Sequence, residues 1–472
     1  MKPPSNAQKS RRWRLRMGER RVLLVVGDLL MAAAALLIGL YYWQLGQEIE
    51  NFVDFLILRP EKWFFLIPIV WLLLLVDTYD THRASNWQAT VRGVTTAALI
   101  GLGIYMLVYF TSSPGSLPRR GVAGFVVTAF LLTLSWRLIY IQIFTDPQFM
   151  RRILLVGAGS TGQVLLQVVN DLWPPPFYLV GLVDDDPDKI GSVIEGYLVL
   201  GGSESILDLI EQEAITDVIV AITGKMNPQM FQMLLDAQEQ GLEITRFPTA
   251  YEQLMGRVPV QHLEADWILR SFVDELQVSS FYEISKRLLD IIGGIVGVVI
   301  LILISPFIAL AIFLESGHPI VFTQTRAGKG GRPYKIFKFR TMVNGNGANT
   351  ELTKEDDQRT TALGRLLRKS RLDEWPQFIN VLRGEMSLVG PRPEQPELMA
   401  HFQREIPFYR GRLLDKPGIT GWAQINFGYA ASIEEMVIKL EYDLYYIKHR
   451  SIWLDISIIL RTAGTVFGLR GR

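Results

Sequence analysis

Two adjacent carboxylates are the residues of this sequence best suited to chemistry. Asp373 and Glu374 lie in the run Arg-Leu-Asp-Glu-Trp-Pro-Gln, residues 371–377. Successive side chains on a helix point about 100° apart, so one acid can attack an electrophile while the other holds a metal ion. Because Pro376 is tolerated only in the first turn of a helix, we expect both acids at a helix N-terminus, which favours a bound diphosphate. The alternative is structural, with Asp373 as the N-cap and Glu374 as a first-turn acid.

Two cations alternate on a strand that precedes this pair. Residues 321–326 and 334–340 predict a β-hairpin, joined through the Gly-Lys-Gly-Gly run at 328–331. Side chains two positions apart on a strand share a face, so Lys338 and Arg340 are predicted to lie together and bind substrate. The alternative is an ordinary charged strand face.

Two arginines flank the acidic pair more closely. Arg371 stands two residues before Asp373, and Arg392 stands between two prolines in Ser-Leu-Val-Gly-Pro-Arg-Pro, residues 387–393. A guanidinium held on a stiff loop can grip a phosphate through two hydrogen bonds. Both arginines are therefore predicted to bind substrate.

A second basic pair opens a long apolar run. Lys286 and Arg287 precede the run at 288–314 and can extend to the level of lipid headgroups, which would suit a lipid phosphate. Asp290 is expected to pair with one of these two cations. The predicted ligand of the pair is a phosphate-bearing lipid.

A series of short motifs occurs in order over the last two hundred residues. Besides the acidic pair, the motifs are Lys-Arg-Leu-Leu-Asp (286–290), Ile-Ser-Pro (304–306), Lys-Phe-Arg-Thr-Met (338–342), Pro-Arg-Pro (391–393), Lys-Pro-Gly-Ile-Thr-Gly-Trp-Ala-Gln (416–424) and Tyr-Asp-Leu-Tyr-Tyr-Ile-Lys-His-Arg-Ser (442–451). In this order they resemble the bacterial sugar transferase family, the polyprenyl-phosphate sugar-1-phosphate transferases. The resemblance covers residues 281–472, and the whole chain is similar to the large multi-domain undecaprenyl-phosphate glucose or galactose phosphotransferases that start capsule, O-antigen or exopolysaccharide assembly.

The resemblance implies a reaction and roles for the acidic pair. The expected activity is transfer of a sugar 1-phosphate from a UDP-sugar to undecaprenyl phosphate, with release of UMP. Asp373 would attack phosphorus and form a phospho-aspartyl intermediate, Glu374 would hold Mg²⁺, and Arg392 would contact the nucleotide. Overall resemblance favours glucose or galactose as the sugar, and an N-acetylated hexosamine stays open.

Two rival functions fit parts of the sequence. A membrane-anchored NAD-dependent sugar-nucleotide dehydratase would use a Tyr-x-x-x-Lys helix, and Tyr334 and Lys338 have that spacing. They lie in a segment with strand-like alternation, however, and no second glycine-rich fingerprint precedes them. The other rival is a non-catalytic scaffold for polysaccharide assembly.

The middle of the chain predicts a Rossmann-type α/β domain. An apolar strand at 153–156 leads into a loop with Gly157, Gly159 and Gly162, and a second strand ends at Asp184. The glycines permit a tight turn and close approach of a phosphate, which makes these four residues candidate nucleotide ligands. Asp184 lies farther along than the usual ribose-binding acid, so a scaffolding or regulatory domain is the alternative. The predicted domains are 1–148, 149–265 and 266–472.

Hydropathy predicts a membrane protein whose soluble parts are cytoplasmic. Apolar runs at about 21–43, 62–78, 90–110 and 121–144 each suit a transmembrane helix. The basic N-terminus keeps that end in the cytoplasm, and four crossings return the chain there. We expect Pro306 to turn the fifth apolar run back as a re-entrant helix at about 286–315, and a kinked spanning helix is the alternative. Asp28, inside the first run, is a candidate for function or helix pairing, or else reaches water.

Composition excludes several classes of site and partner. The chain has 472 residues, a net charge of +1 and no cysteine, so disulfides and thiolate chemistry are excluded and nucleic acid is not an expected partner. Its five histidines lack metal-ligand spacing. The fold expected is thus a membrane-helical part, an α/β domain and a membrane-associated α+β catalytic domain, together forming a homodimer.

Overall fold

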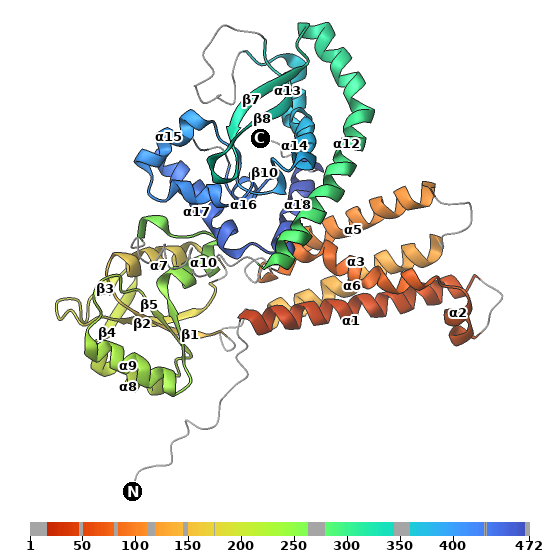
Figure 1. Cartoon of the computed structure of the whole chain (residues 1–472). Coiled ribbons are helices and arrows are strands. Elements are labelled where there is room, and N and C mark those ends of the chain that lie inside the picture. The colour runs from red at the N-terminus through yellow and green to blue at the C-terminus, as the bar shows by residue number, and fades with distance from the viewer. Residues whose placement is uncertain are drawn as a thin grey trace. The chain divides into compact units, whose positions relative to one another are not determined.

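The computed structural model divides the chain into two compact units, Met1–Ala250 and Tyr251–Arg472, and each is described by itself (Figure 1). The described residues are 17–46, 51–79, 84–111, 119–144, 150–173, 175–262, 279–343, 359–428, 430 and 432–467. The first unit holds a bundle of apolar helices and an α/β domain, and the second holds the elements that carry the acidic pair.

The helical part of the first unit is built on long apolar helices that lie side by side (Figure 1). Buried side chains such as Leu36, Phe64 and Trp71 form its core, while most apolar side chains on the outer faces are exposed, as in a membrane-embedded bundle. The elements are α1 (Met17–Gln44), α2 (Phe52–Leu58), the 3₁₀ helix η2 (Lys62–Leu66), α3 (Ile67–Leu74), the 3₁₀ helix η3 (Val76–Tyr79), α5 (Trp87–Thr111) and α6 (Arg119–Phe144).

Three of the four predicted crossings in this part are long continuous helices. Spans Glu19–Gln44, Trp87–Met106 and Arg120–Ile143 are long and apolar enough to cross a membrane. The predicted crossing at 62–78 differs, because it is divided into η2, α3 and η3, and α3 has only 8 residues. Pro68 in the first turn of α3 lacks the amide hydrogen that a continuous α-helix would use there, which is consistent with a new helix starting at that point.

A buried ion pair joins two of the long helices. Asp28 of α1 and Arg137 of α6 are 0% and 1% exposed, and Arg137 Nη2 lies 2.6 Å from Asp28 Oδ2. The same guanidinium donates to the backbone carbonyl of Thr78. A charge in an apolar environment is tolerated when it is paired in this way. Of the roles predicted for Asp28, helix pairing is the one that the structure bears out.

The α/β domain confirms the predicted fold of the middle of the chain. Its six strands have the order β3-β4-β2-β1-β5-β6, and all neighbours are parallel except β3 and β4. This is a doubly wound arrangement, with helices α7, α8 and α9 in the connections β1–β2, β4–β5 and β5–β6, whereas β2 is joined to β4 through the short strand β3. The elements are β1 (Arg152–Val156), α7 (Ser160–Asp171), β2 (Tyr178–Val183), β3 (Val193–Ile194), β4 (Tyr197–Gly201), η5 (Ser203–Ser205), α8 (Ile206–Gln212), β5 (Asp217–Val220), α9 (Pro228–Glu239), β6 (Glu243–Arg246) and α10 (Phe247–Met255).

The second unit combines one long apolar helix with short helices and two small sheets (Figure 1). A β-hairpin, β7 with β8, and a parallel pair, β9 with β10, support the loops around the acidic pair. The elements are η6 (Val260–His262), α12 (Ser280–Ser316), β7 (Val321–Ala327), η7 (Lys329–Gly331), β8 (Pro333–Phe339), α13 (Ala362–Lys369), η8 (Leu372–Gln377), α14 (Phe378–Arg383), β9 (Ser387–Val389), α15 (Pro396–Glu405), η9 (Tyr409–Leu414), β10 (Gly418–Thr420), α16 (Trp422–Asn426), α17 (Ile433–His449) and α18 (Ile452–Phe467).

Helix α12 has one exposed apolar face and one face packed on this unit. It runs through Pro306 as a single helix of 37 residues and bends along its length (Figure 1). Gly294 and Gly297 permit the close approach of α14, because an added Cβ would lie 2.7 Å from Leu382 and 2.3 Å from the ring of Phe378. The helix that is long and apolar enough to enter a membrane is thus packed directly on the segment that follows the acidic pair.

Residues 251–262 belong to the core of the second unit. Val258 and Val260 are buried in the same cluster as residues of α17, and Trp422 Nε1 donates to the carbonyl of Gly256 over 2.7 Å. The domain boundaries predicted at 148/149 and 265/266 fall in segments outside the described residues.

Candidate active site

The acidic pair lies in a tight turn between two helices. Helix α13 ends at Lys369, Arg371 adopts a left-handed conformation with φ 58°, and the 3₁₀ helix η8 then carries both acids into α14. Residues with a side chain seldom adopt positive φ, and such strain is typical of functional sites. Both acids lie in the first turn of η8, so the predicted helix N-terminus is that of a 3₁₀ helix, and Pro376 lies inside η8 and not in the first turn of an α-helix.

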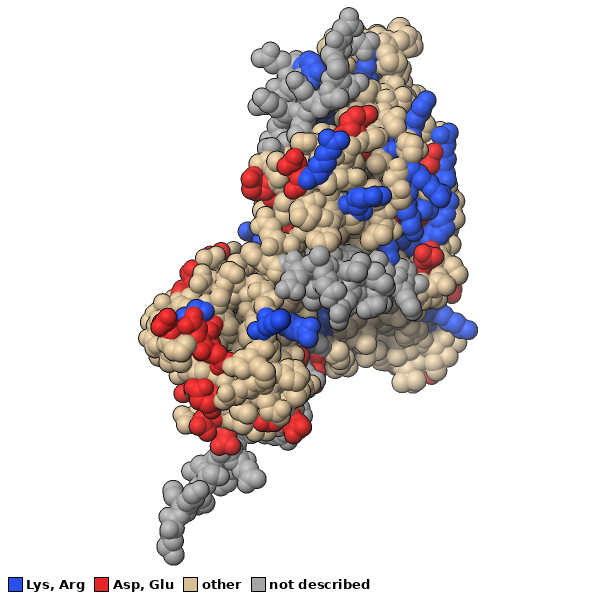
Figure 2. All heavy atoms as spheres, turned by 60° about the vertical axis from the view of Figure 1, so that its left-hand side comes forward, with Lys and Arg blue, Asp and Glu red and all other residues tan. Residues whose placement is uncertain are grey.

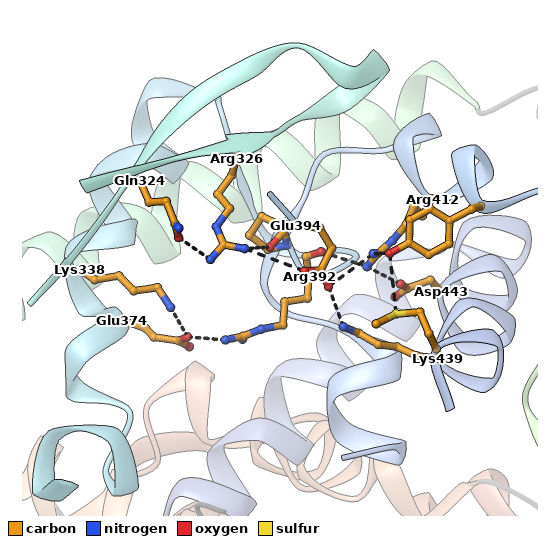
Figure 3. A network of polar contacts seen from close by, with 12 residues as sticks. Gln324, Arg326, Lys338, Glu374, Arg392, Glu394, Arg412, Lys439 and Asp443 are labelled. Carbon is orange, nitrogen blue, oxygen red and sulfur yellow. Dashed lines mark hydrogen bonds and ion pairs between the residues drawn. The ribbon is translucent and has the colours of Figure 1, made fainter. Parts of the chain in front are cut away.

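Glu374 is surrounded by cations. Its Oε1 accepts from Lys338 Nζ at 2.8 Å and from Arg392 Nη2 at 2.9 Å (Figure 3). Arg371 Nη1 lies 3.7 Å from Oε2 of the same carboxylate. Burial alone would raise the pKa of this carboxyl, but the three cations hold it below its ordinary value. Glu374 is therefore ionised across the physiological pH range.

Asp373 is buried beside this cluster. It is 9% exposed, and among the described residues its carboxylate has no hydrogen bond or ion pair. Burial and the neighbouring charge of Glu374 raise its pKa to about 6, against the opposing effect of Lys338, Arg368 and Arg392. Two adjacent carboxylates thus have opposite pKa shifts, which is how one site assigns different roles to two acids.

The loop that carries Arg392 is fixed by a second charge network. Glu394 pairs with Lys439 at 2.8 Å and with Arg412 at 3.5 Å, and Arg412 also binds Asp443 at 2.8 Å (Figure 3). Arg412 Nη2 donates to the backbone carbonyl of Arg392 at 3.0 Å. This network could not be predicted from the sequence, although Asp443 lies in one of the quoted motifs, because its members come from separate segments.

A shallow open pocket lies beside Arg392. It is lined by the loop from Pro391 to Glu394 together with Met399, Arg412 and Asp415. Arg392 therefore contacts the acidic pair and also lines open space, which is the geometry expected of a group that binds a ligand from solvent.

Not every predicted substrate ligand lies in this cluster. Arg340 donates to the carbonyls of Ser316, Gly317 and His318 and so holds the C-terminal end of α12. Arg287 donates to the carbonyls of Val381 and Leu382 at the end of α14. Both guanidiniums are engaged by backbone, which leaves the phosphate contacts predicted for them without support from this geometry.

Lys286 also differs from its predicted position. It is 8% exposed and donates to Val389 O, Tyr446 Oη and Asp455 Oδ2 within the protein. Asp290 accepts from Ser387 Oγ and from Leu388 N, and not from either neighbouring cation as predicted. The lysine therefore faces the interior of the unit and does not extend toward lipid headgroups.

The glycine loop of the α/β domain has the predicted turn but an internal occupant. Gly157 has φ 104°, and an added Cβ at Gly162 would lie 2.2 Å from the carbonyl of Gly157, so both positions require glycine, whereas Gly159 faces open space. Asp184 Oδ2 accepts from the amide of Ala158 at 2.7 Å. Burial would raise the pKa of Asp184, but hydrogen bonds from Ala158 and Asp186 and the charge of Lys189 lower it. The carboxylate of Asp184 thus binds a backbone amide that a bound phosphate would contact.

The spacing that suggested a dehydratase has no catalytic geometry. Tyr334 and Lys338 both lie in strand β8, where residues four positions apart are separated by about 13 Å, roughly twice the distance on a helix. Lys338 binds Glu374 instead, and burial raises the pKa of Tyr334, which opposes its ionisation.

The acidic pair fits a magnesium ion only together with substrate. Carboxylate oxygens are ligands that Mg²⁺ prefers, yet no group of three or more His, Cys, Asp or Glu side chains within the described ranges is placed to hold a metal. Since Lys338 and Arg392 already occupy Glu374 Oε1, an added cation needs phosphate oxygens to complete its ligands and offset these charges. The residues fit Mg²⁺ that binds with a diphosphate.

Two family models match separate parts of the chain. A model described as bacterial sugar transferase matches residues 281–469, and a model described as CoA-binding domain matches residues 75–248. The first range contains the acidic pair and the three cations around Glu374, and the second contains the glycine loop.

Curated relatives extend these matches. The chain is 43% identical over 223 residues to a UDP-N-acetylgalactosamine-undecaprenyl-phosphate N-acetylgalactosaminephosphotransferase from Aeromonas hydrophila, covering 46% of this chain and 52% of the relative. It is 34% identical over 326 residues to the UDP-glucose:undecaprenyl-phosphate glucose-1-phosphate transferase of Escherichia coli strain K12, covering 66% and 67%. It is 39% identical over 188 residues to an uncharacterized sugar transferase, EpsL, of Bacillus subtilis strain 168, covering 40% and 90%. The match spans about half the length of the first relative.

Proposed function

Because the chain belongs to the bacterial sugar transferase family, we propose that it transfers a sugar 1-phosphate from a UDP-sugar to undecaprenyl phosphate. The products are undecaprenyl-diphosphate sugar and UMP, in the initiating step of exopolysaccharide, capsule or O-antigen synthesis. The observation that carries this proposal is the pair of neighbouring carboxylates with opposite pKa shifts, one held by cations and the other without a partner.

In the first step Asp373 acts as the nucleophile. One of its carboxylate oxygens bonds to the sugar-proximal phosphorus, the phosphoanhydride bond breaks, and UMP leaves with the bonding electron pair. A pKa of about 6 keeps Asp373 mostly ionised at neutral pH while leaving it more basic than an ordinary aspartate. Glu374 stays ionised and keeps Lys338 and Arg392 close to the reacting phosphates.

In the second step the lipid phosphate resolves the intermediate. An oxygen of undecaprenyl phosphate bonds to the phosphorus of the phospho-aspartyl group, and the carboxylate of Asp373 leaves unchanged. Lys338, Arg371 and Arg392 supply positive charge to both steps, since all three lie at Glu374.

Mg²⁺ would be held by Glu374 together with the diphosphate. When bound, the ion supplies charge neutralisation between the carboxylates and the substrate phosphates. Asp373 and Glu374 both lie in the buried turn η8, so the protein supplies the two carboxylates and excludes bulk water around them.

The proposed topology has four crossings, a re-entrant α12, and both termini and all soluble parts in the cytoplasm. Residues Lys62–Tyr79 extend about 30 Å if their 3₁₀ and α-helical parts are collinear, enough for the second crossing. Lys286, Asp290 and Gly294 lie on a face of α12 that is buried against the catalytic elements. This burial supports a helix that returns to the membrane side on which the catalytic elements lie. A reporter fused after Arg472 that is active only in the periplasm would contradict this topology.

A nucleotide in the α/β domain and a homodimer are separate proposals. The open cradle at Gly159 and the matched CoA-binding model favour a nucleotide, whereas the contact of Asp184 with Ala158 opposes one. Thermal shift of the purified protein with CoA, NAD and UDP-sugars tests the ligand. Light scattering of the protein in nanodiscs tests the dimer.

One assay tests the reaction and names the sugar. The purified protein is incubated with undecaprenyl phosphate, Mg²⁺ and a panel of UDP-glucose, UDP-galactose and the two UDP-N-acetylhexosamines. We expect UMP release with one sugar and a lipid product whose mass is that of the diphosphate-linked sugar. Release of UMP without a lipid product, or oxidation of the sugar, would contradict the transferase assignment.

A further inference from the structure

The Lys-Arg-Leu-Leu-Asp motif at the start of α12 joins that helix to the backbone of the catalytic loops. Lys286 donates to Val389 O at 3.0 Å, and Asp290 accepts from Leu388 N and Ser387 Oγ, each at 2.8 Å. Residues four positions apart lie on one face of a helix, so Lys286 and Asp290 contact the same short strand, β9. The motif therefore contacts protein backbone.

Lys286 has its three donors directed to three acceptors. Besides Val389 O, its Nζ lies 2.8 Å from Tyr446 Oη and 3.1 Å from Asp455 Oδ2. An ammonium has three N–H groups, so this set satisfies it completely. Tyr446 also donates to Asp455 Oδ1 at 2.7 Å and lies 3.3 Å from Val389 O. Two of the groups in this buried network thus reach the carbonyl of Val389.

Only two residues separate Val389 from Arg392, a cation that holds Glu374. The chain continues through Gly390 and Pro391 to Arg392, whose Nη2 contacts Glu374 at 2.9 Å. Gly390 packs closely on the backbone of Lys416, because an added Cβ would lie 2.2 Å from Lys416 O, and its amide donates to Thr420 O. Pro391 and Pro393, on the two sides of Arg392, each have a fixed φ angle. A shift of Val389 is therefore transmitted along the backbone to the guanidinium of Arg392.

We propose that Lys286 is a positioning residue, through which the apolar helix α12 sets the position of Arg392 at the acidic pair. The inference rests on the proposed function, because it assigns a purpose to the placement of Arg392. Its consequence is that a displacement of α12 changes the site without any direct contact between α12 and substrate.

A purely structural role is the competing explanation. Removing one partner of a buried ion pair destabilises a protein, and Lys286 pairs with Asp455, which is fully buried. The two explanations differ in one respect: a structural role lowers the amount of folded protein, whereas a positioning role lowers the turnover of the molecules that remain folded.

Two tyrosine variants provide a matched comparison. Tyr446→Phe removes a hydroxyl that donates to Asp455, accepts from Lys286 and lies 3.3 Å from Val389 O. Tyr282→Phe removes a hydrogen bond to Asp455 over 3.1 Å, and among the described residues no hydrogen bond joins Tyr282 to Val389. Both lose the same kind of group from the same network. We expect Tyr446→Phe to lower kcat severalfold and Tyr282→Phe to keep it near that of the wild type, at equal folded concentration.

A double-mutant cycle tests the path to Arg392. In the full chain in nanodiscs, Lys286→Met is expected to lower kcat for UMP release about 10- to 100-fold, the range typical of residues that orient a ligand-binding group. In an Arg392→Lys background the same change is expected to cost less than about threefold, because the group that it positions is already altered.

Each outcome of the cycle bears on one proposal. Equal losses from Lys286→Met in both backgrounds, or equal losses from the two tyrosine variants, would overturn the positioning role. If Lys286→Met does not fold, the tyrosine pair decides the question alone. Failure of the wild-type protein to release UMP in the same assay would instead contradict the proposed function.

Discussion

The glycine loop of the α/β domain and the turn that carries Glu374 are both suited to phosphates, but they differ in charge. In the glycine loop, the carboxylate of Asp184 accepts a hydrogen bond from the amide of Ala158. In the turn, Lys338, Arg392 and Arg371 surround the single carboxylate of Glu374. Residues 151–250 contain 14 acidic and 5 basic residues, against 24 and 28 in residues 251–472. Figure 2 shows acidic side chains gathered on the visible face of the α/β domain. A phosphate-binding backbone is therefore not sufficient, and the surplus of cations marks the second site for a diphosphate.

The largest effect expected is that of Asp373→Asn. An amide cannot form an acyl phosphate, so UMP release and covalent labelling by UDP-sugar should both fall by at least about 1,000-fold. Asp208→Asn on the exposed surface of α8 is the matched control and should retain full activity. Normal turnover by folded Asp373→Asn protein would exclude the covalent mechanism, and label on another residue would relocate the nucleophile.

Glu374→Gln should lower turnover by about 100-fold, because the neutral amide holds neither Mg²⁺ nor its three cations as firmly. Raised Mg²⁺ should restore part of the activity, since the ion is still retained by the diphosphate oxygens. Titration of Mg²⁺ against UMP release, with Asp373→Asn in parallel, measures the difference. An identical metal dependence in wild-type and Glu374→Gln protein would remove Glu374 as the metal ligand.

Activity should fall at acid pH because of Asp373. Its pKa is raised to about 6, so the nucleophile is protonated below that pH, and kcat/KM should fall about tenfold per pH unit there. Glu374, whose pKa is lowered, contributes no change in this window. A pH profile of UMP release checks the sign, and a rate that is constant from pH 7 to pH 5 would contradict the assignment.

A fragment that starts near Phe281 should keep measurable transfer activity, since every proposed substrate contact lies in the second unit. It should be less stable than a fragment that starts at Tyr251, by about 3 kcal/mol, because Val258 and Val260 no longer bury their side chains. Thermal unfolding of both fragments in detergent measures this. A folded, membrane-bound and wholly inactive Phe281 fragment would show that the chemistry needs the first unit.

The smallest effect on turnover is expected from Asp184→Asn. The variant removes the internal anion at Ala158, so nucleotides should bind the α/β domain more tightly while UMP release stays the same. Thermal shift with CoA and ADP, compared with the wild type, detects the change. Loss of transfer activity by folded Asp184→Asn protein would mean that the two sites are not independent.

Local rules were sufficient to predict the α/β domain and the apolar helices from the sequence. The strand, glycine-loop and helix pattern from Ile153 onward depends on neighbours within a few residues. The first strand ends at Val156 as predicted, and the second ends at Val183, one residue before the predicted Asp184. The apolar run at 62–78 was harder to predict, because composition fixes its hydropathy but not the division into three short helices.

The sequence alone identified the acidic pair and the family of the chain, because the order of the motifs can be read without knowledge of the contacts. Which cations reach Glu374 was decided only by the tertiary structure. Lys338, Arg371 and Arg392 do so, whereas Lys286, Arg287 and Arg340, equally basic in the sequence, bind carbonyls of the chain. A side chain's charge is local, but its partner is set by elements up to about a hundred residues away, as the contact of Lys286 with Val389 illustrates. The physical reason is that packing brings α12, β9 and the Arg392 loop together, and no spacing rule in the sequence contains that information.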